Sequence, residues 1–145
     1  MNREILFRAK KVDGGEWVEG YVVKKHGAYF IYDINNSDAC RQNNYLIEED
    51  TICQYTGLTD KNGKKIYEGD LLRGFQYPFC YDGEYNYYAE VCWFEEVCAF
   101  GLYIVKYTNA NVCGISEGCT ELMENWNPQN WEVISNVFDN KDGEK

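Results

Sequence analysis

The residues with the clearest chemical potential in this sequence are its seven cysteines: Cys40, Cys53, Cys80, Cys92, Cys98, Cys113 and Cys119. One spacing occurs twice, because five residues separate Cys92 from Cys98 and Cys113 from Cys119. Structural zinc sites usually take such pairs from a tight turn, with about two to four residues between the ligands. The longer spacing favours free thiols that fill core or surface positions over a zinc site or a disulfide, and we predict no metal and no cofactor.

The single histidine and the densest run of carboxylates are the other candidates for catalysis. His26 lies in the segment KKHGAY beside two lysines, whereas a nucleophilic triad or a zinc site needs a histidine held in a pocket. Glu48, Glu49 and Asp50 are adjacent, which is typical of a hydrated turn, and acid/base catalysis needs carboxylates in different environments. Phosphate loops of the Walker or dinucleotide type are absent. We therefore predict that the protein is not an enzyme and has no catalytic residues.

The charge balance restricts the partners that this protein can attract. Fourteen Lys and Arg residues against twenty-four Asp and Glu residues give a net charge of −10, which repels phosphate backbones. The basic segments at 8–11, 24–25 and 61–65 are short and are expected to be solvated turns. No apolar run is long enough to span a bilayer, and the start MNREILFRAK lacks the apolar core of a signal peptide. We expect a cytoplasmic protein without membrane contact, and nucleic-acid binding is disfavoured.

The elements that position these residues are predicted to be strands. A chain of 145 residues suits one domain, and its aromatic content of 17% favours pleated, half-buried surfaces. The first 34 residues are typical of three strands in a meander, with a hairpin at Asp13-Gly14 and another at His26-Gly27. A loop is expected at 35–44, followed by short strands at 45–47 and 52–55. Residues 87–94, 99–107 and 131–140 are the remaining long strands.

The middle of the chain is rich in turn residues. Asn62-Gly63 predicts a type I′ hairpin, and Gly69 predicts a second tight reversal before the apolar run LLRGF. A Gly-Asp entry into such a strand is typical of small SH3-like barrels. Thr120 is a candidate N-cap for a helix of one or two turns in CTELMENW. The tyrosine-rich loop at 78–86 favours a protein interface, with a platform for stacking bases as the alternative.

Three blocks lie at both ends and in the middle of the chain: REILFRAKKVDGGEWVEGYVV, QYTGLTDKNGKKIYEGDLLR and WEVISNVFDN. Together they resemble the YopX family of phage and prophage proteins. Ser135 departs from a glycine that is frequent in the family. The resemblance implies an all-β, small-barrel domain over 1–140, with possible sub-units 1–58 and 59–140 and a charged tail at 141–145. The family signature comprises Gln54, Tyr55, Thr56, Gly57, Leu58, Asp60, Asn62, Gly63, Ile66, Tyr67, Glu68, Gly69 and Asp70.

The resemblance implies no catalytic residue. Our leading hypothesis is an accessory protein of a phage or prophage, in the cytoplasm of the bacterial cell that carries it, which binds an unknown protein partner or itself. The first alternative is a module of phage or host DNA metabolism that binds DNA or mimics it. The second is an enzyme of unrecognised type.

Overall fold

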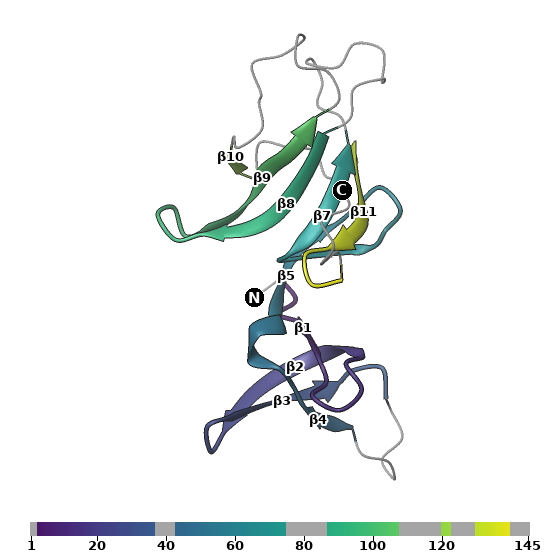
Figure 1. Cartoon of the computed structure of the whole chain (residues 1–145), viewed down its shortest axis with the longest axis vertical. Coiled ribbons are helices and arrows are strands. Elements are labelled where there is room, and N and C mark those ends of the chain that lie inside the picture. Colours follow the sequence, from purple (N-terminus) through teal and green to yellow (C-terminus); the bar gives the residue numbers. More distant parts are fainter. Residues whose placement is uncertain (1–2, 37–42, 75–86, 108–119, 123–129, 140–145) are drawn as a thin grey trace. The chain divides into compact units, whose positions relative to one another are not determined.

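The computed structural model describes residues 3–36, 43–74, 87–107, 120–122 and 130–139 (Figure 1). The chain divides into two compact units, Met1–Gly57 and Leu58–Lys145. Strands dominate both units, and the described residues contain one short 3-10 turn, η1 (Glu49–Thr51). The predicted all-β class is therefore confirmed. Among the described residues no helix is long and apolar enough to cross a membrane.

The amino-terminal unit is built on a β-meander, as predicted. Its strands are β1 (Phe7–Lys10), β2 (Trp17–Lys25), β3 (Ala28–Asp33), β4 (Asn44–Leu46) and β5 (Cys53–Thr59). They form one sheet in the order β4-β3-β2-β1-β5, which continues to β6 (Lys65–Tyr67) beside β5. β5 runs across the boundary between the units. His26 and Gly27 both have positive φ angles, 53° and 80°, at the tip of the β2–β3 hairpin. This two-residue turn matches the right-handed twist of the strands that it joins.

One face of this sheet carries the core of the unit. Ala9, Val18, Ile31 and Ile47 are buried in one cluster. At the far end of β1 the chain pairs with the residues that follow β4, through a bridge between Lys11 and Ile47. The described strands nevertheless form two antiparallel sheets and no closed barrel, so the SH3-like barrel stays a prediction.

The carboxyl-terminal unit holds the second sheet. β6 (Lys65–Tyr67) precedes β7 (Asp70–Gly74), β8 (Tyr87–Phe94), β9 (Ala99–Tyr107), β10 (Thr120–Leu122) and β11 (Trp131–Asn136). The sheet order is β10-β9-β8-β7-β11, and each pair is antiparallel. The predicted strands at 87–94 and 99–107 are confirmed, whereas the strand predicted at 131–140 ends at Asn136 and continues as a turn over 137–139. The core of this unit lies on one face of the sheet and comprises Ile66, Leu72, Ala89, Val91, Leu102, Ile104 and Trp131.

The helix predicted from Thr120 is wrong over the residues that the structure describes there. Thr120, Glu121 and Leu122 form β10, which pairs with Tyr103, Leu102 and Gly101 of β9. A cap residue followed by a helix former is a local preference, and a backbone ladder to an existing strand outweighs it. The rest of the segment, and the tyrosine-rich loop at 78–86, lie outside the described residues.

Candidate functional site

The family signature crosses the boundary between the units. Gln54, Tyr55, Thr56 and Gly57 belong to the part of β5 in the amino-terminal unit. The remaining residues belong to the carboxyl-terminal unit, where they form the end of β5, two turns, β6 and the start of β7: Leu58, Asp60, Asn62, Gly63, Ile66, Tyr67, Glu68, Gly69 and Asp70. The signature is therefore a continuous run of backbone turns and short strands.

Asp60 is the centre of the first turn. Its side chain is 1% exposed. Oδ1 accepts hydrogen bonds from the backbone N–H groups of Asn62 and Lys64, at 2.8 and 2.9 Å, and Oδ2 accepts one from Val133 at 2.9 Å. Burial alone raises the pKa of Asp60, but the three amide hydrogen bonds outweigh burial and lower it below its ordinary value. The buried carboxylate thus holds the turn together and attaches it to β11.

The turn type predicted for Asn62-Gly63 is wrong, although the hairpin itself is confirmed. A type I′ turn needs positive φ at both residues, and here Gly63 has φ 79° while Asn62 is not in the left-handed region. The amide of Gly63 donates to the Asp60 carbonyl, and the amide of Asp60 donates to the Lys64 carbonyl. This is the longer hairpin loop that ends on a left-handed glycine. The Asp60 carboxylate favours it because it accepts amides on both sides of Gly63.

The second turn of the signature contains another buried carboxylate. Asp70 is fully buried, and its Oδ2 accepts the backbone N–H of Tyr67 at 2.8 Å. Gly69 has φ 85°; its N–H donates to the carbonyl of Val91, and its own carbonyl accepts the N–H of Val137. Both aspartates of the signature therefore accept main-chain amides, and these hydrogen bonds hold the two turns in place.

The face of the second sheet that lies opposite its core carries an ion pair. Arg73 of β7 and Glu132 of β11 are cross-strand partners, and their side chains form a salt bridge. The hydrogen bond from Arg73 lowers the pKa of Glu132 below its ordinary value, and the same contact raises the pKa of Arg73. Both side chains reach solvent, so this pair contributes little to stability.

The described cysteines lie in three different environments. Cys53 is buried, Cys92 is partly buried and Cys98 is exposed, and all three are free thiols. Burial, together with the carboxylate of Glu90, raises the pKa of Cys92 to about 12, and the Cys92 thiol lies 3.4 Å from Glu90 Oε2. Cys40, Cys80, Cys113 and Cys119 lie outside the described residues. Within the described part, no three His, Cys, Asp or Glu side chains come together as metal ligands.

These environments predict selective thiol chemistry. We expect a maleimide or iodoacetamide to modify Cys98 in the folded protein at least about tenfold faster than Cys92, because the thiolate is the reactive form and Cys92 is held as a thiol. Peptide mapping by mass spectrometry after timed labelling measures both rates. Labelling in urea is the control, in which the two rates should converge. Equal rates in the native protein would contradict the assignment.

The other sequence candidates do not converge on a site. His26 is exposed at its turn tip, and Glu49 and Asp50 belong to η1, directly before β5. Thr51 orders this turn, because its Oγ1 donates to the Glu48 carbonyl and accepts the N–H of Lys10. The histidine and the acidic run are therefore separate features of the amino-terminal unit.

An exposed apolar surface, in contrast, covers the face of the amino-terminal sheet opposite its core. Directly paired residues of antiparallel strands point to the same side. Tyr21 of β2 pairs with Tyr32 of β3, and Val23, Phe30 and Leu46 form a row across β2, β3 and β4. We call the aromatic face the set of apolar residues on this side: Trp17, Tyr21, Val23, Phe30, Tyr32 and Leu46.

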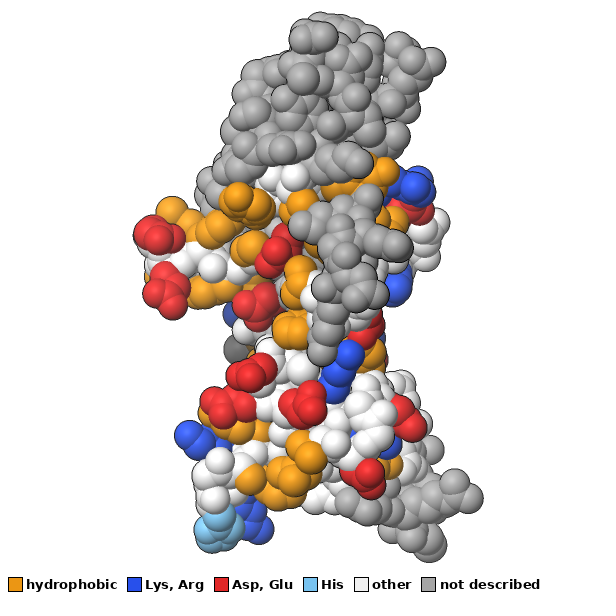
Figure 2. Space-filling model, in the orientation of Figure 1, with side chains coloured by type: hydrophobic (Ala, Val, Ile, Leu, Met, Phe, Trp, Pro, Cys, Tyr) orange, Lys and Arg blue, Asp and Glu red, His pale blue; other side chains and the backbone are white. Residues whose placement is uncertain are grey.

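The aromatic face is well exposed. Tyr21 is 53% exposed, Leu46 44%, Val23 43% and Tyr32 42%. Figure 2 shows hydrophobic side chains among charged ones at the surface of the amino-terminal unit. Single exposed apolar residues are normal in soluble proteins, but a contiguous set rimmed by charges is typical of an interaction surface.

Cations lie at the edge of this face. The guanidinium of Arg8 is 4.8 Å from the centroid of the Trp17 ring, and Lys10 Nζ is 5.2 Å from it. Arg8 and Lys10 reach this side because they pair with Glu19 and Trp17 in the β1–β2 ladder. The cations neutralise part of the local acidity and cover the indole ring.

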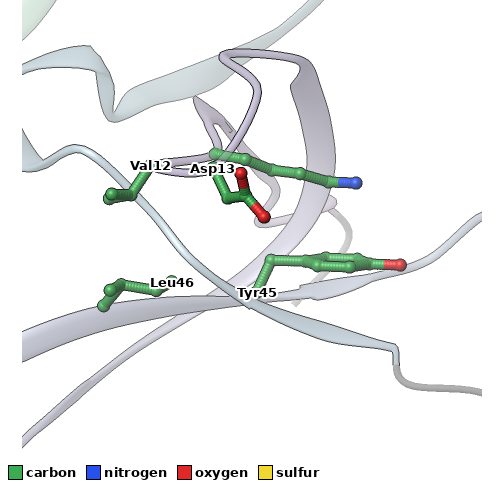
Figure 3. A pocket seen from close by; sticks show the side chains of 5 residues that line it. Val12, Asp13, Tyr45 and Leu46 are labelled. Atoms are coloured by element: carbon green, nitrogen blue, oxygen red, sulfur yellow. The ribbon is translucent and has the colours of Figure 1, made fainter.

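A cleft adjoins the same face where residues 11–13 run beside β4. Its volume is about 310 Å³, and Lys11, Val12, Asp13, Tyr45 and Leu46 line it. Figure 3 shows Val12 and Leu46 side by side at one end, with Asp13 and Tyr45 at the other. Lys11 Nζ lies 3.9 Å from the Tyr45 ring centroid and 3.4 Å from Glu16 Oε2. The cleft therefore joins an apolar end to a charged end.

Sequence reasoning assigned Arg8, Lys10 and Lys11 to a solvated turn and did not find this surface. The alternation of Trp17, Glu19 and Tyr21 was a usable signal, because residues two apart share one face of a strand. The missing information was which face is buried. That depends on Ile47 and Ile52, which come later in the chain and pack into the core cluster.

The fold and these surfaces define an all-β protein of two units whose signature forms turns and short strands and whose amino-terminal sheet exposes apolar residues. The family model of the YopX protein matches residues 6–142. The chain therefore belongs to the YopX family, and the predicted resemblance is confirmed. No curated protein matches the chain.

Proposed function

We propose that this chain is a phage or prophage accessory protein that lacks enzymatic activity and acts by binding another protein or a second copy of itself. The observation that carries the proposal is the aromatic face. Tyrosine and tryptophan are enriched where proteins meet, since they combine a large apolar area with a polar group. The aliphatic side chains in the Val23–Leu46 row also suit a protein surface better than a nucleic acid.

The charge of the chain supports the same proposal. A net charge of −10 disfavours phosphate backbones, and two cations on the side of the aromatic face, Arg8 and Lys10, lie over Trp17. A base that stacks on this indole must displace them. The signature residues support a folding role, because the carboxylates of Asp60 and Asp70 accept main-chain amides.

A pull-down from host lysate tests the proposal. The bait is the full chain, with and without nuclease, next to the variant Tyr21→Ser/Tyr32→Ser and the control Tyr103→Ser. Tyr103 is 42% exposed and lies on β9, in the other unit. We expect a host protein to bind to the wild type and to the control even after nuclease treatment. The double variant should not bind this protein. Retention of nucleic acid alone, or a monomer that retains nothing, would contradict the proposal.

A further inference from the structure

We infer that the aromatic face binds an extended, acidic segment of a partner protein. This inference rests on the proposed function and names the class of partner. The observations that carry it are the arrangement of the exposed apolar rows, the charges that surround them and the cleft beside Leu46.

The rows give the face the shape of a site for an extended chain. The side chains of Tyr21 and Tyr32 lie next to each other, and the row Val23, Phe30 and Leu46 runs parallel to them on the same side of the sheet. An extended segment presents every second side chain to one side, so its apolar residues can alternate with charged ones. At the end of the second row the Val12–Leu46 end of the cleft accepts one apolar side chain.

The charges select an acidic partner. By register, Arg8, Lys10 and Lys25 lie on the side of the aromatic face, together with the carboxylate of Glu19. Glu48 also lies on this side, because its N–H donates to the Lys10 carbonyl next to the Lys11–Ile47 bridge. Three cations and two carboxylates therefore give this face a net charge of +1, while the whole chain carries −10. An acidic segment is therefore attracted to this face, and the rest of the protein repels it. Such complementarity chiefly sets specificity and the rate of association.

The same arrangement disfavours a symmetric contact with a second copy. In a two-fold contact the face meets itself, so that two positive faces approach each other. Both copies also carry −10 overall. A contact of this face with an acidic surface elsewhere on a second copy is a separate outcome of the experiment below.

Two labelled peptides provide the probe. Both are ten-residue peptides of alternating sequence, one of Glu and Val and the other of Lys and Val, and binding to the full chain is measured by fluorescence anisotropy. We expect the acidic peptide to bind at least about tenfold more tightly than the basic one at low salt, with the difference shrinking as salt screens the charges. Equal binding of both peptides, or binding of neither, would overturn the inference.

Charge reversal at two adjacent lysines supplies a matched pair of variants. Lys25 lies on the side of the aromatic face, whereas Lys24 lies on the opposite side, where its Nζ is 5.3 Å from the Tyr29 ring centroid. Lys25→Glu should reduce the preference for the acidic peptide several-fold. Lys24→Glu makes the same change in net charge and should leave this preference unchanged. Equal effects of the two variants would show a general charge effect and contradict the site.

Further measurements distinguish an acidic peptide from a nucleic acid or a second copy as the partner of this face. Tyr21→Ser/Tyr32→Ser, with circular dichroism as the check on folding, should abolish binding of the acidic peptide. Binding of a labelled oligothymidine in its place would assign the face to nucleic acid. If light scattering shows that the wild type is an oligomer and the same variant is a monomer, the aromatic face binds a second copy of the chain. If the pull-down retains a protein through this face but the peptides bind equally, the inference fails and the proposed function stands.

Discussion

Replacement of Asp60 with alanine is expected to lower the free energy of unfolding of the carboxyl-terminal unit by about 3 kcal/mol or more. The carboxylate is buried and accepts three backbone amides, from Asn62, Lys64 and Val133. Alanine leaves those donors without their acceptor in a site that is closed to water. The amide of Lys61 still donates to the Trp131 carbonyl at 3.0 Å, so one link between the turn and β11 remains.

The isosteric variant Asp60→Asn separates charge from shape. The asparagine oxygen replaces Oδ1 and accepts the amides of Asn62 and Lys64, but its NH₂ group then faces the Val133 N–H that Oδ2 accepts at 2.9 Å. Two donors oppose each other there. We therefore expect a loss for Asn that is smaller than the loss for Ala but still above about 1 kcal/mol.

The pH dependence of stability gives an independent measure of the same group. Because the pKa of Asp60 is lowered in the folded protein, its contribution is fully present above the unfolded value of about 3.9. It is lost as the pH falls from that value through the folded pKa. The stability difference between the wild type and Asp60→Asn should accordingly shrink below about pH 4.

Urea denaturation measures these free energies, and residue-resolved hydrogen exchange identifies the unit that is affected. Protection of β11 amides should fall in Asp60→Ala. Asp139→Ala is the control, because this acid is exposed and lies beyond β11 in the same unit. If Asp60→Ala is as stable as Asp139→Ala, the turn does not depend on the buried carboxylate.

Replacement of Gly20 with alanine is expected to disrupt the amino-terminal sheet. A Cβ atom at Gly20 would lie 1.7 Å from the carbonyl oxygen of Tyr32 and 2.7 Å from the carbonyl carbon. The obstacle is backbone, so no side-chain rotation removes it, and β2 and β3 must move apart at the centre of the meander. We expect a loss of about 3 kcal/mol or more, together with lost protection of the β2 and β3 amides in hydrogen exchange.

Gly63→Asn is the matched control for the loss of a glycine. A Cβ at Gly63 meets nothing within 4 Å, and asparagine tolerates the positive φ of 79° better than most residues do. Its effect should stay within about 1 kcal/mol. A Gly20→Ala protein with unchanged protection in β2 and β3 would contradict the close approach of the two strands.

The sequence alone was sufficient for most of the strands and for the family. Alternation of apolar and polar residues and glycine-rich turns are local signals, so β8 and β9 appear at the predicted bounds and the amino-terminal meander is confirmed. The signature was identifiable because turns with positive φ restrict residue type strongly. These inferences need no knowledge of distant contacts.

Other inferences depended on contacts between residues far apart in the sequence. Thr120 has the local properties of a helix cap, yet its segment pairs with β9. The turn at Asn62-Gly63 resembles a type I′ turn locally, but Asp60 selects a longer loop through its amide contacts. In both cases a hydrogen bond that the sequence does not display outweighs a local preference.

What the sequence by itself determined is the all-β class, most strands and membership of the YopX family, because these follow from local periodicity and from turn chemistry. Only the tertiary structure decided which side of the amino-terminal sheet is buried and which carries Tyr21, Tyr32 and their flanking cations. Alternation separates two faces of a strand, but it does not say which of two apolar faces meets the core. That choice is made when later segments of the chain cover one face and leave the other in solvent.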